Sequence, residues 1–189
     1  MKRRMTAIGM LILVIGAMWM IDRMIPRSID MTLTGVKVRL GTDGVKAGTE
    51  PAVVILQGKL YTSLSGKRTF KGEATVAGEQ IPVPRDQRKL TIHFAKEGWG
   101  AMSYPYLVNG GQGAPVRTEI YQSHLIFANE DFTQVSLLLA NRMTDSNGNY
   151  KQTVWDPENG MAISAPAATR DEALAISDTL MREYLESLR

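Results

Sequence analysis

The stretch AVVILQGKLYTSLSGKRTFKGEATV, residues 52–76, gives the clearest indication of the fold because it contains two strand-like runs joined by a short polar turn. The runs are rich in β-branched and aromatic residues, and the turn is Ser65-Gly66-Lys67-Arg68. Such a pattern is typical of a β-hairpin. We predict one long strand over 52–64, or two strands around Gly58, and a return strand over 69–76. The body of the chain is therefore expected to be antiparallel β structure.

Other segments carry the same kind of signal. Alternating apolar and polar residues, or short apolar runs, predict further strands at 31–40, 89–94, 101–108, 118–128, 134–143 and 161–164. Asn147-Gly148 is a strong hairpin signal and predicts a return strand over 151–155. Two prolines restrict 81–84 to a sheet edge, because proline lacks the N–H that a central strand donates.

The C-terminus changes to a helical period. Thr169 and Glu172 form a capping-box pattern, which predicts a helix over 169–188. Apolar and small residues then recur at three- and four-residue spacing: Leu174, Ser177, Met181, Tyr184 and Leu188, with Leu180 and Leu185 widening the stripe. We predict an α+β fold for 31–189, a single domain with this amphipathic helix packed on a mainly antiparallel sheet. The alternative is a pure sandwich with the helix merely appended.

An apolar run near the N-terminus predicts a membrane anchor. Met5–Ile21 is seventeen uncharged residues behind Lys2, Arg3 and Arg4, about 25 Å of helix. The run ends without the small residues of a peptidase site, which favours an uncleaved signal-anchor over a cleaved signal peptide. We predict a transmembrane helix over 5–25, a cytoplasmic tail at 1–4 and a tether at 26–30. The domain that follows is then extracytoplasmic.

Charge and cysteine content narrow the class of protein. The net charge of +3 belongs to the first 26 residues, and the remaining 18 basic and 18 acidic residues balance. The basic pI is therefore no sign of a nucleic-acid partner, and we predict none. The chain has no cysteine, which excludes disulfides, thiolate metal sites and thiol nucleophiles. An exported domain without disulfides favours a bacterial cell envelope.

The sequence contains no recognisable catalytic or metal-binding pattern. His93 and His124 are the only histidines. His93 alternates with Leu90, Ile92 and Phe94, which predicts a solvent-facing side chain. His124 follows Ser123, but adjacent strand residues point to opposite faces and cannot form a nucleophile–base pair. We predict no catalytic residue, metal site or cofactor.

The best binding-site candidate in the sequence is a set of aromatic residues. Trp99, Tyr104 and Tyr106 lie in a segment rich in glycine and proline, residues 97–115. We predict that they bind sugar rings or the apolar side chains of a partner. The alternative is that they fill one end of the β core. A basic cluster at Arg85, Arg88 and Lys89 is either solvated or close to phosphate-bearing envelope polymers or lipid headgroups.

Two functions follow from these observations. The first is a single-pass, membrane-anchored, non-catalytic interaction module that binds an envelope protein or a cell-wall polymer. The alternative is an envelope-polymer hydrolase that uses two carboxylates about 5–10 Å apart. Its candidate residues are Glu97, Glu119, Glu130 and Asp131.

Overall fold

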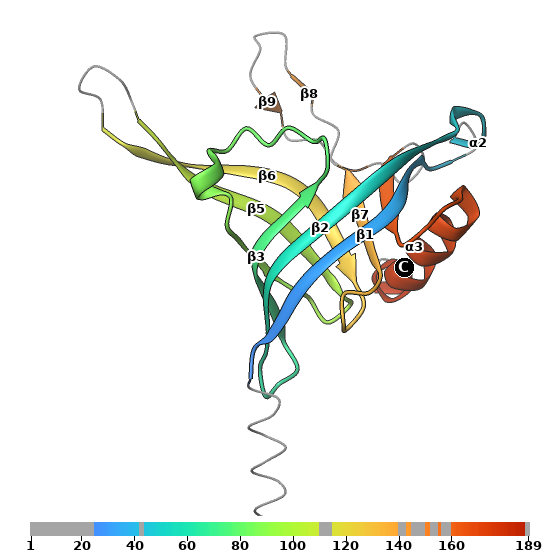
Figure 1. The fold of residues 1–189 in the computed structure, drawn as a ribbon, viewed down its shortest axis with the longest axis horizontal. Helices are drawn as coiled ribbons and strands as arrows, with labels where there is room; N and C mark the ends of the chain where they lie inside the picture. Colours follow the sequence, from blue (N-terminus) through green and yellow to red (C-terminus); the bar gives the residue numbers. More distant parts are fainter. Residues whose placement is uncertain are drawn as a thin grey trace, which may run out of the picture.

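The structure is a computed structural model that describes residues 25–41, 44–109, 115–139, 143–144, 150–151, 155 and 160–187. Its elements in chain order are β1 (Arg27–Arg39), α2 (Gly44–Ala47), β2 (Thr49–Thr62), β3 (Arg68–Val76), the 3₁₀ turn η1 (Arg85–Gln87), β4 (Leu90–His93), β5 (Trp99–Val108), β6 (Arg117–Ala128), β7 (Val135–Leu139), β8 (Met143–Thr144), β9 (Tyr150–Lys151), β10 (Met161–Ala165) and α3 (Arg170–Ser187). Figure 1 shows one large curved sheet with α3 against its outer face. The predicted antiparallel β domain with a packed C-terminal helix is confirmed.

The large sheet curls until it is nearly closed. Its eight strands follow the order β4-β3-β2-β1-β10-β7-β6-β5, and every ladder is antiparallel. The two ends of this order, β4 and β5, are joined by a tight turn in which Ala95 N–H donates to the Trp99 carbonyl at 2.8 Å. They form no ladder with each other. The predicted hairpin of β2 and β3 is confirmed, with β2 continuous through Gly58.

Inward-facing side chains fill the space inside the sheet. The largest fully buried ones in this core are Leu56, Leu60, Phe70, Ile92, Tyr104, Ile126, Phe132 and Leu137. Phe132 lies in the turn between β6 and β7 and packs on Phe70 and Phe94, with ring centroids 5.6 and 5.4 Å apart. This turn therefore closes one end of the core.

The helix α3 covers the outer face of β1, β6, β7 and β10. Its buried residues are Ala173, Ser177 and Met181, and they meet outward-facing side chains such as Val38 and Phe127. Ser177 also forms a buried triangle of hydroxyls with Ser136 of β7 and Ser164 of β10, with Oγ–Oγ distances of 2.9, 2.8 and 3.2 Å. Apolar packing and these hydrogen bonds together hold α3 on the sheet.

The start of α3 follows the predicted capping box in part. Thr169 Oγ1 accepts a hydrogen bond from Glu172 N–H at 3.3 Å. The Glu172 carboxylate accepts from Ala168 N–H at 2.7 Å rather than from Thr169 N–H. The predicted stripe is confirmed at Ser177 and Met181, whereas Leu185 is 39% exposed. Residue 188 lies outside the described part of the chain.

Two predicted segments differ in the structure. Residues 27–30, expected as part of a tether, begin β1, because they pair with residues 57–60 of β2 and bury Ile29. Residues 81–84, expected as an edge strand, form a loop over the core that buries Ile81 and Val83. The carbonyls of Ile81 and Val83 accept hydrogen bonds from the Arg88 guanidinium at 3.0 and 2.8 Å instead of from a neighbouring strand.

Some predictions fall wholly or partly outside the described residues. Asn147-Gly148 is one of them, although the flanking β8 and β9 pair at Met143↔Lys151 and Thr144↔Tyr150. Residues 5–24 of the expected anchor are another. Within the described residues, no helix has both the length and the apolar character needed to cross a membrane.

Candidate functional site

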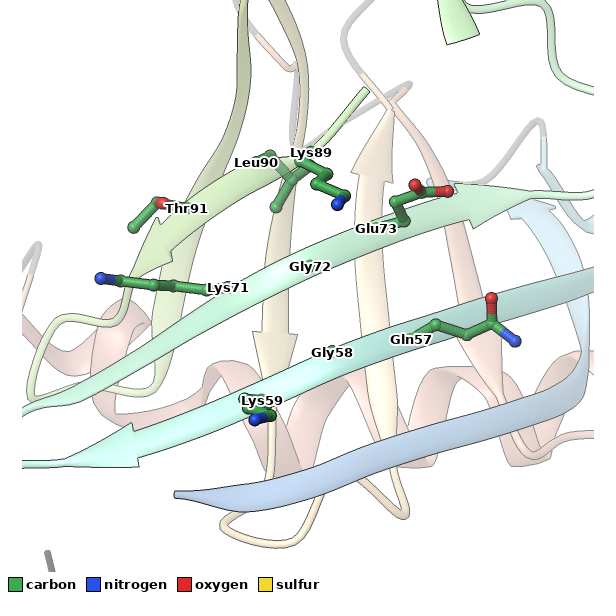
Figure 2. A pocket seen from close by; sticks show the side chains of 9 residues that line it. All are labelled: Gln57, Gly58, Lys59, Lys71, Gly72, Glu73, Lys89, Leu90 and Thr91. Atoms are coloured by element: carbon green, nitrogen blue, oxygen red, sulfur yellow. The ribbon is translucent and has the colours of Figure 1, made fainter. Parts of the chain in front are cut away.

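A shallow groove of about 460 Å³ crosses the outer face of β2, β3 and β4 (Figure 2). Its lining residues are Gln57, Gly58, Lys59, Lys71, Gly72, Glu73, Lys89, Leu90 and Thr91. The register of the three strands places several of these residues directly opposite one another. Gln57 lies opposite Glu73, and Lys59 lies opposite Lys71, which in turn lies opposite Thr91. Because side chains alternate along a strand, these residues share the face that points away from the buried Leu56 and Leu60.

Two glycines bring the strands close together beneath this groove. Gly58 and Gly72 lie directly opposite each other. A Cβ atom on Gly72 would collide with the Gln57 carbonyl oxygen and lie 2.6 Å from Gly58 Cα. A glycine in a strand marks such a close backbone approach. Side chains at these two positions would point to the inner face, where a Cβ on Gly58 would lie 2.9 Å from the Phe70 ring. The two glycines therefore bring β2 and β3 together, while the groove on the outer face is bordered by the polar side chains on either side of them.

The groove is locally basic although the domain as a whole is balanced in charge. Lys59 and Lys71 are exposed and lie at directly opposed positions of β2 and β3, an arrangement that is destabilising for like charges. Lys71 Nζ lies 5.2 Å from the centroid of the Tyr61 ring, a cation–π contact. No carboxylate of the described residues forms an ion pair with either lysine or with Lys89.

This arrangement is suited to holding an anion. Lysine ammonium groups bind phosphate and carboxylate as point charges. Opposed strand residues have Cβ atoms about 5 Å apart, so Lys59 and Lys71 can reach the same or adjacent anionic groups. Thr91 and Gln57 add neutral donors, and the Gln57 amide donates to Asp30 at 3.2 Å. The groove offers binding groups and no nucleophile paired with a base.

His93 lies beside the groove, on the same outer face. It is exposed, as predicted, and its Nδ1 is 3.3 Å from Thr69 Oγ1 of the opposite residue on β3.

The structure separates the three predicted aromatic residues. Trp99 is half-buried on the outer face, where its ring packs on Tyr184 of α3 at 5.9 Å. Tyr104 is fully buried in the core and donates to the Ala74 carbonyl at 2.7 Å. Tyr106 is half-buried and donates to Glu119 at 2.9 Å. The three rings thus share no single surface, and their role in binding stays a prediction.

Tyr104 lies near a polar cluster that the sequence did not indicate. Burial raises the pKa of the Tyr104 phenol, and the nearby negative charge of Glu79 adds to the effect. Glu79 carboxylate oxygens lie 2.8 and 2.9 Å from Nε2 of the buried His124, while His124 Nδ1 has no hydrogen-bond partner among the described residues. The pair ties the loop after β3 to β6. No periodicity links two residues 45 positions apart, so sequence reasoning could not find it.

The four candidate carboxylates lie outside the groove. Glu119 binds Tyr106 and forms an ion pair with Arg117 at 2.8 Å. Nine residues of β6, about 30 Å, separate Glu119 from the end of the strand, beyond which Glu130 and Asp131 follow. Glu119 therefore cannot form a carboxylate pair with either of them. Glu97 lies in the turn between β4 and β5.

Metal ligation has no candidate among the described residues, since they contain no group of three His, Asp or Glu side chains that could hold an ion.

No protein family, curated protein or solved structure matches this chain. The groove is the feature that the described residues support best, because it combines exposed charge, a fixed strand scaffold and open access.

Proposed function

We propose that this protein is a membrane-anchored, non-catalytic interaction module of the cell envelope. Its ligand is an anionic envelope polymer that binds along the groove of β2, β3 and β4. The observation that carries the proposal is the direct opposition of Lys59 and Lys71, both exposed and without a carboxylate partner among the described residues. Such an arrangement costs stability unless an external anion neutralises it.

The shape of the groove favours a polymer over a small molecule. Small-ligand pockets are concave and enclose most of the ligand surface, whereas this groove is shallow and open. A polymer with repeating phosphate or carboxylate groups can contact Lys59, Lys71 and Lys89 together. Several weak contacts on one chain then add up, because each further contact is intramolecular.

The N-terminal sequence supports a location at the membrane. An apolar run of seventeen residues behind three basic residues is typical of a signal-anchor with its N-terminus in the cytoplasm. The domain that follows would then meet polymers on the outer side of that membrane.

The proposal is tested by measuring the binding of linear polyphosphate to the full chain in nanodiscs of neutral lipid. We expect binding that weakens as salt increases, with no binding of neutral dextran. A Lys59→Gln/Lys71→Gln variant should bind about two- to thirtyfold more weakly, since exposed ion pairs contribute about 0.2–1 kcal/mol each.

A matched control variant makes the same change in charge at two lysines outside the groove. Lys46 and Lys96 are exposed and do not line it. The Lys46→Gln/Lys96→Gln variant should bind polyphosphate as the unmodified chain does. Equal weakening in both double variants would show general charge attraction and would contradict a groove site. Binding to anionic lipid vesicles alone, and not to polyphosphate, would identify headgroups as the ligand instead.

A further inference from the structure

The paired strand β1 begins close to the first residue that the structure describes, Ile25. β1 starts at Arg27, which pairs at once with Leu60 of β2. Only residues 22–26 separate this strand from the apolar run that ends at Ile21. Five residues span at most about 18 Å even when fully extended. The end of the sheet where β1 begins is therefore held close to wherever the apolar run lies.

The turn between β2 and β3 extends beyond this point. β2 continues for two residues past Leu60, about 7 Å, before the turn at 63–67. In Figure 1 this turn and the start of β1 lie at the same end of the molecule. A membrane reached by the apolar run would thus lie next to the turn.

The turn is closed by three hydrogen bonds and presents an apolar side chain. Ser63 N–H donates to the Lys67 carbonyl at 2.9 Å, Gly66 N–H donates to the Ser63 carbonyl at 2.9 Å, and Lys67 N–H donates to Ser63 Oγ at 3.0 Å. Leu64 is nevertheless 56% exposed, and Ile25 at the same end is 59% exposed. These hydrogen bonds hold Leu64 away from the core.

Basic residues flank this apolar apex. Lys67 in the turn and Arg27 at the start of β1 are both exposed. An apolar side chain beside lysine and arginine is the combination that binds the interface of an anionic bilayer: the apolar group enters the headgroup–acyl boundary and the cations contact the headgroups.

We infer that the turn between β2 and β3 docks on an anionic lipid bilayer, with the Leu64 side chain inserted at the headgroup–acyl boundary and Lys67 and Arg27 against the headgroups. The inference rests on the membrane anchor of the proposed function. It adds a second membrane contact, which would fix the orientation of the sheet and hold the groove at a constant height above the lipid.

The test uses the absence of cysteine in the chain. The full-length Leu64→Cys variant carries one environment-sensitive fluorophore in vesicles of phosphatidylcholine and phosphatidylglycerol, some of which contain lipids with nitroxide quenchers. We expect a blue-shifted emission and severalfold stronger quenching than for the same label at Val45→Cys. Val45 is 72% exposed on α2, at the opposite end of β1 and β2. Retention of both variants in vesicles after an alkaline wash shows that they are anchored.

Three outcomes are distinct. Anchored protein with stronger quenching at residue 64 supports the inference. Anchored protein with equal quenching at residues 64 and 45 overturns it and leaves the proposed anchor intact. Loss of the unmodified chain from washed vesicles overturns the anchor and with it the docking of this turn. Polyphosphate binding by the groove is measured separately and depends on neither result.

Discussion

At the scale of single residues, hydrogen bonds from Thr133 lower the pKa of the Asp131 carboxyl group. Thr133 Oγ1–H donates to Asp131 Oδ1 at 2.7 Å, and Thr133 N–H donates to the same oxygen at 3.3 Å. These hydrogen bonds favour the charged carboxylate and lower the pKa of Asp131 from its ordinary value of 3.8, with a smaller contribution from Arg27. The stabilisation is present above the pKa of the unfolded chain and is lost as pH falls through the lower pKa of the folded state.

We predict that Thr133→Val raises the pKa of Asp131, because it removes the stronger of the two donors. Carboxyl NMR titration measures the value. Thr133→Ser keeps a hydroxyl at the same position and should leave the pKa low. An unchanged pKa in the valine variant would mean that the backbone N–H and Arg27 account for the shift.

At the scale of elements, the hairpin of β2 and β3 depends on its two opposed glycines. The atoms nearest to a Cβ on Gly72 would be backbone atoms, namely the Gln57 carbonyl group and Gly58 Cα. Backbone atoms cannot move aside as the end of a flexible side chain can. The close packing of this hairpin therefore depends on the absence of a side chain at both positions.

Gly72→Ala should destabilise the protein by about 1–3 kcal/mol, the usual cost of forcing extra atoms into a packed site. Urea unfolding followed by far-UV circular dichroism measures the change. Thr91→Ala, an exposed substitution in the same groove, should stay within about 0.5 kcal/mol of the unmodified chain. An equally small effect for Gly72→Ala would show that the strands can separate at little cost.

At the scale of the whole molecule, we expect the sheet to open most easily at β4, next to the gap in the ladder between β4 and β5. β4 is four residues long and forms a ladder only with β3, whereas β1 pairs on both sides, with β2 and β10. Opening β4 breaks one ladder of four residue pairs, whereas opening β1 breaks a ladder of twelve pairs and a second ladder of four. Stability to local opening is therefore expected to differ across the sheet.

We predict that backbone amides of β4 exchange with deuterium at least about tenfold faster than those of β1, which corresponds to about 1.4 kcal/mol. Native-state hydrogen exchange followed by mass spectrometry compares the two strands, with β10 as a second internal reference. Uniform protection of β4, β1 and β10 would indicate that the sheet opens as one unit, with β4 and β5 held as firmly as hydrogen-bonded neighbours.

Most strands, the main hairpin, the capped C-terminal helix and the outward direction of His93 could be predicted from local sequence. Each of these depends on side-chain periodicity or on turn and capping residues within a few positions. The same alternation explains why Trp99 and Tyr104, five positions apart, lie on opposite faces of β5.

The neighbour order of the strands, the near closure of the sheet, the hydrogen bond between His124 and Glu79 and the groove came from the tertiary structure alone. Lys59 and Lys71 are twelve positions apart and meet only through the register of β2 with β3. Lys89 joins them through the pairing of β4 with β3. Local periodicity predicts which face of the sheet each side chain lies on. It does not predict which side chains meet across strands, because that depends on strand register and on pairing between distant segments. Packing of the whole core sets both the register and the pairing.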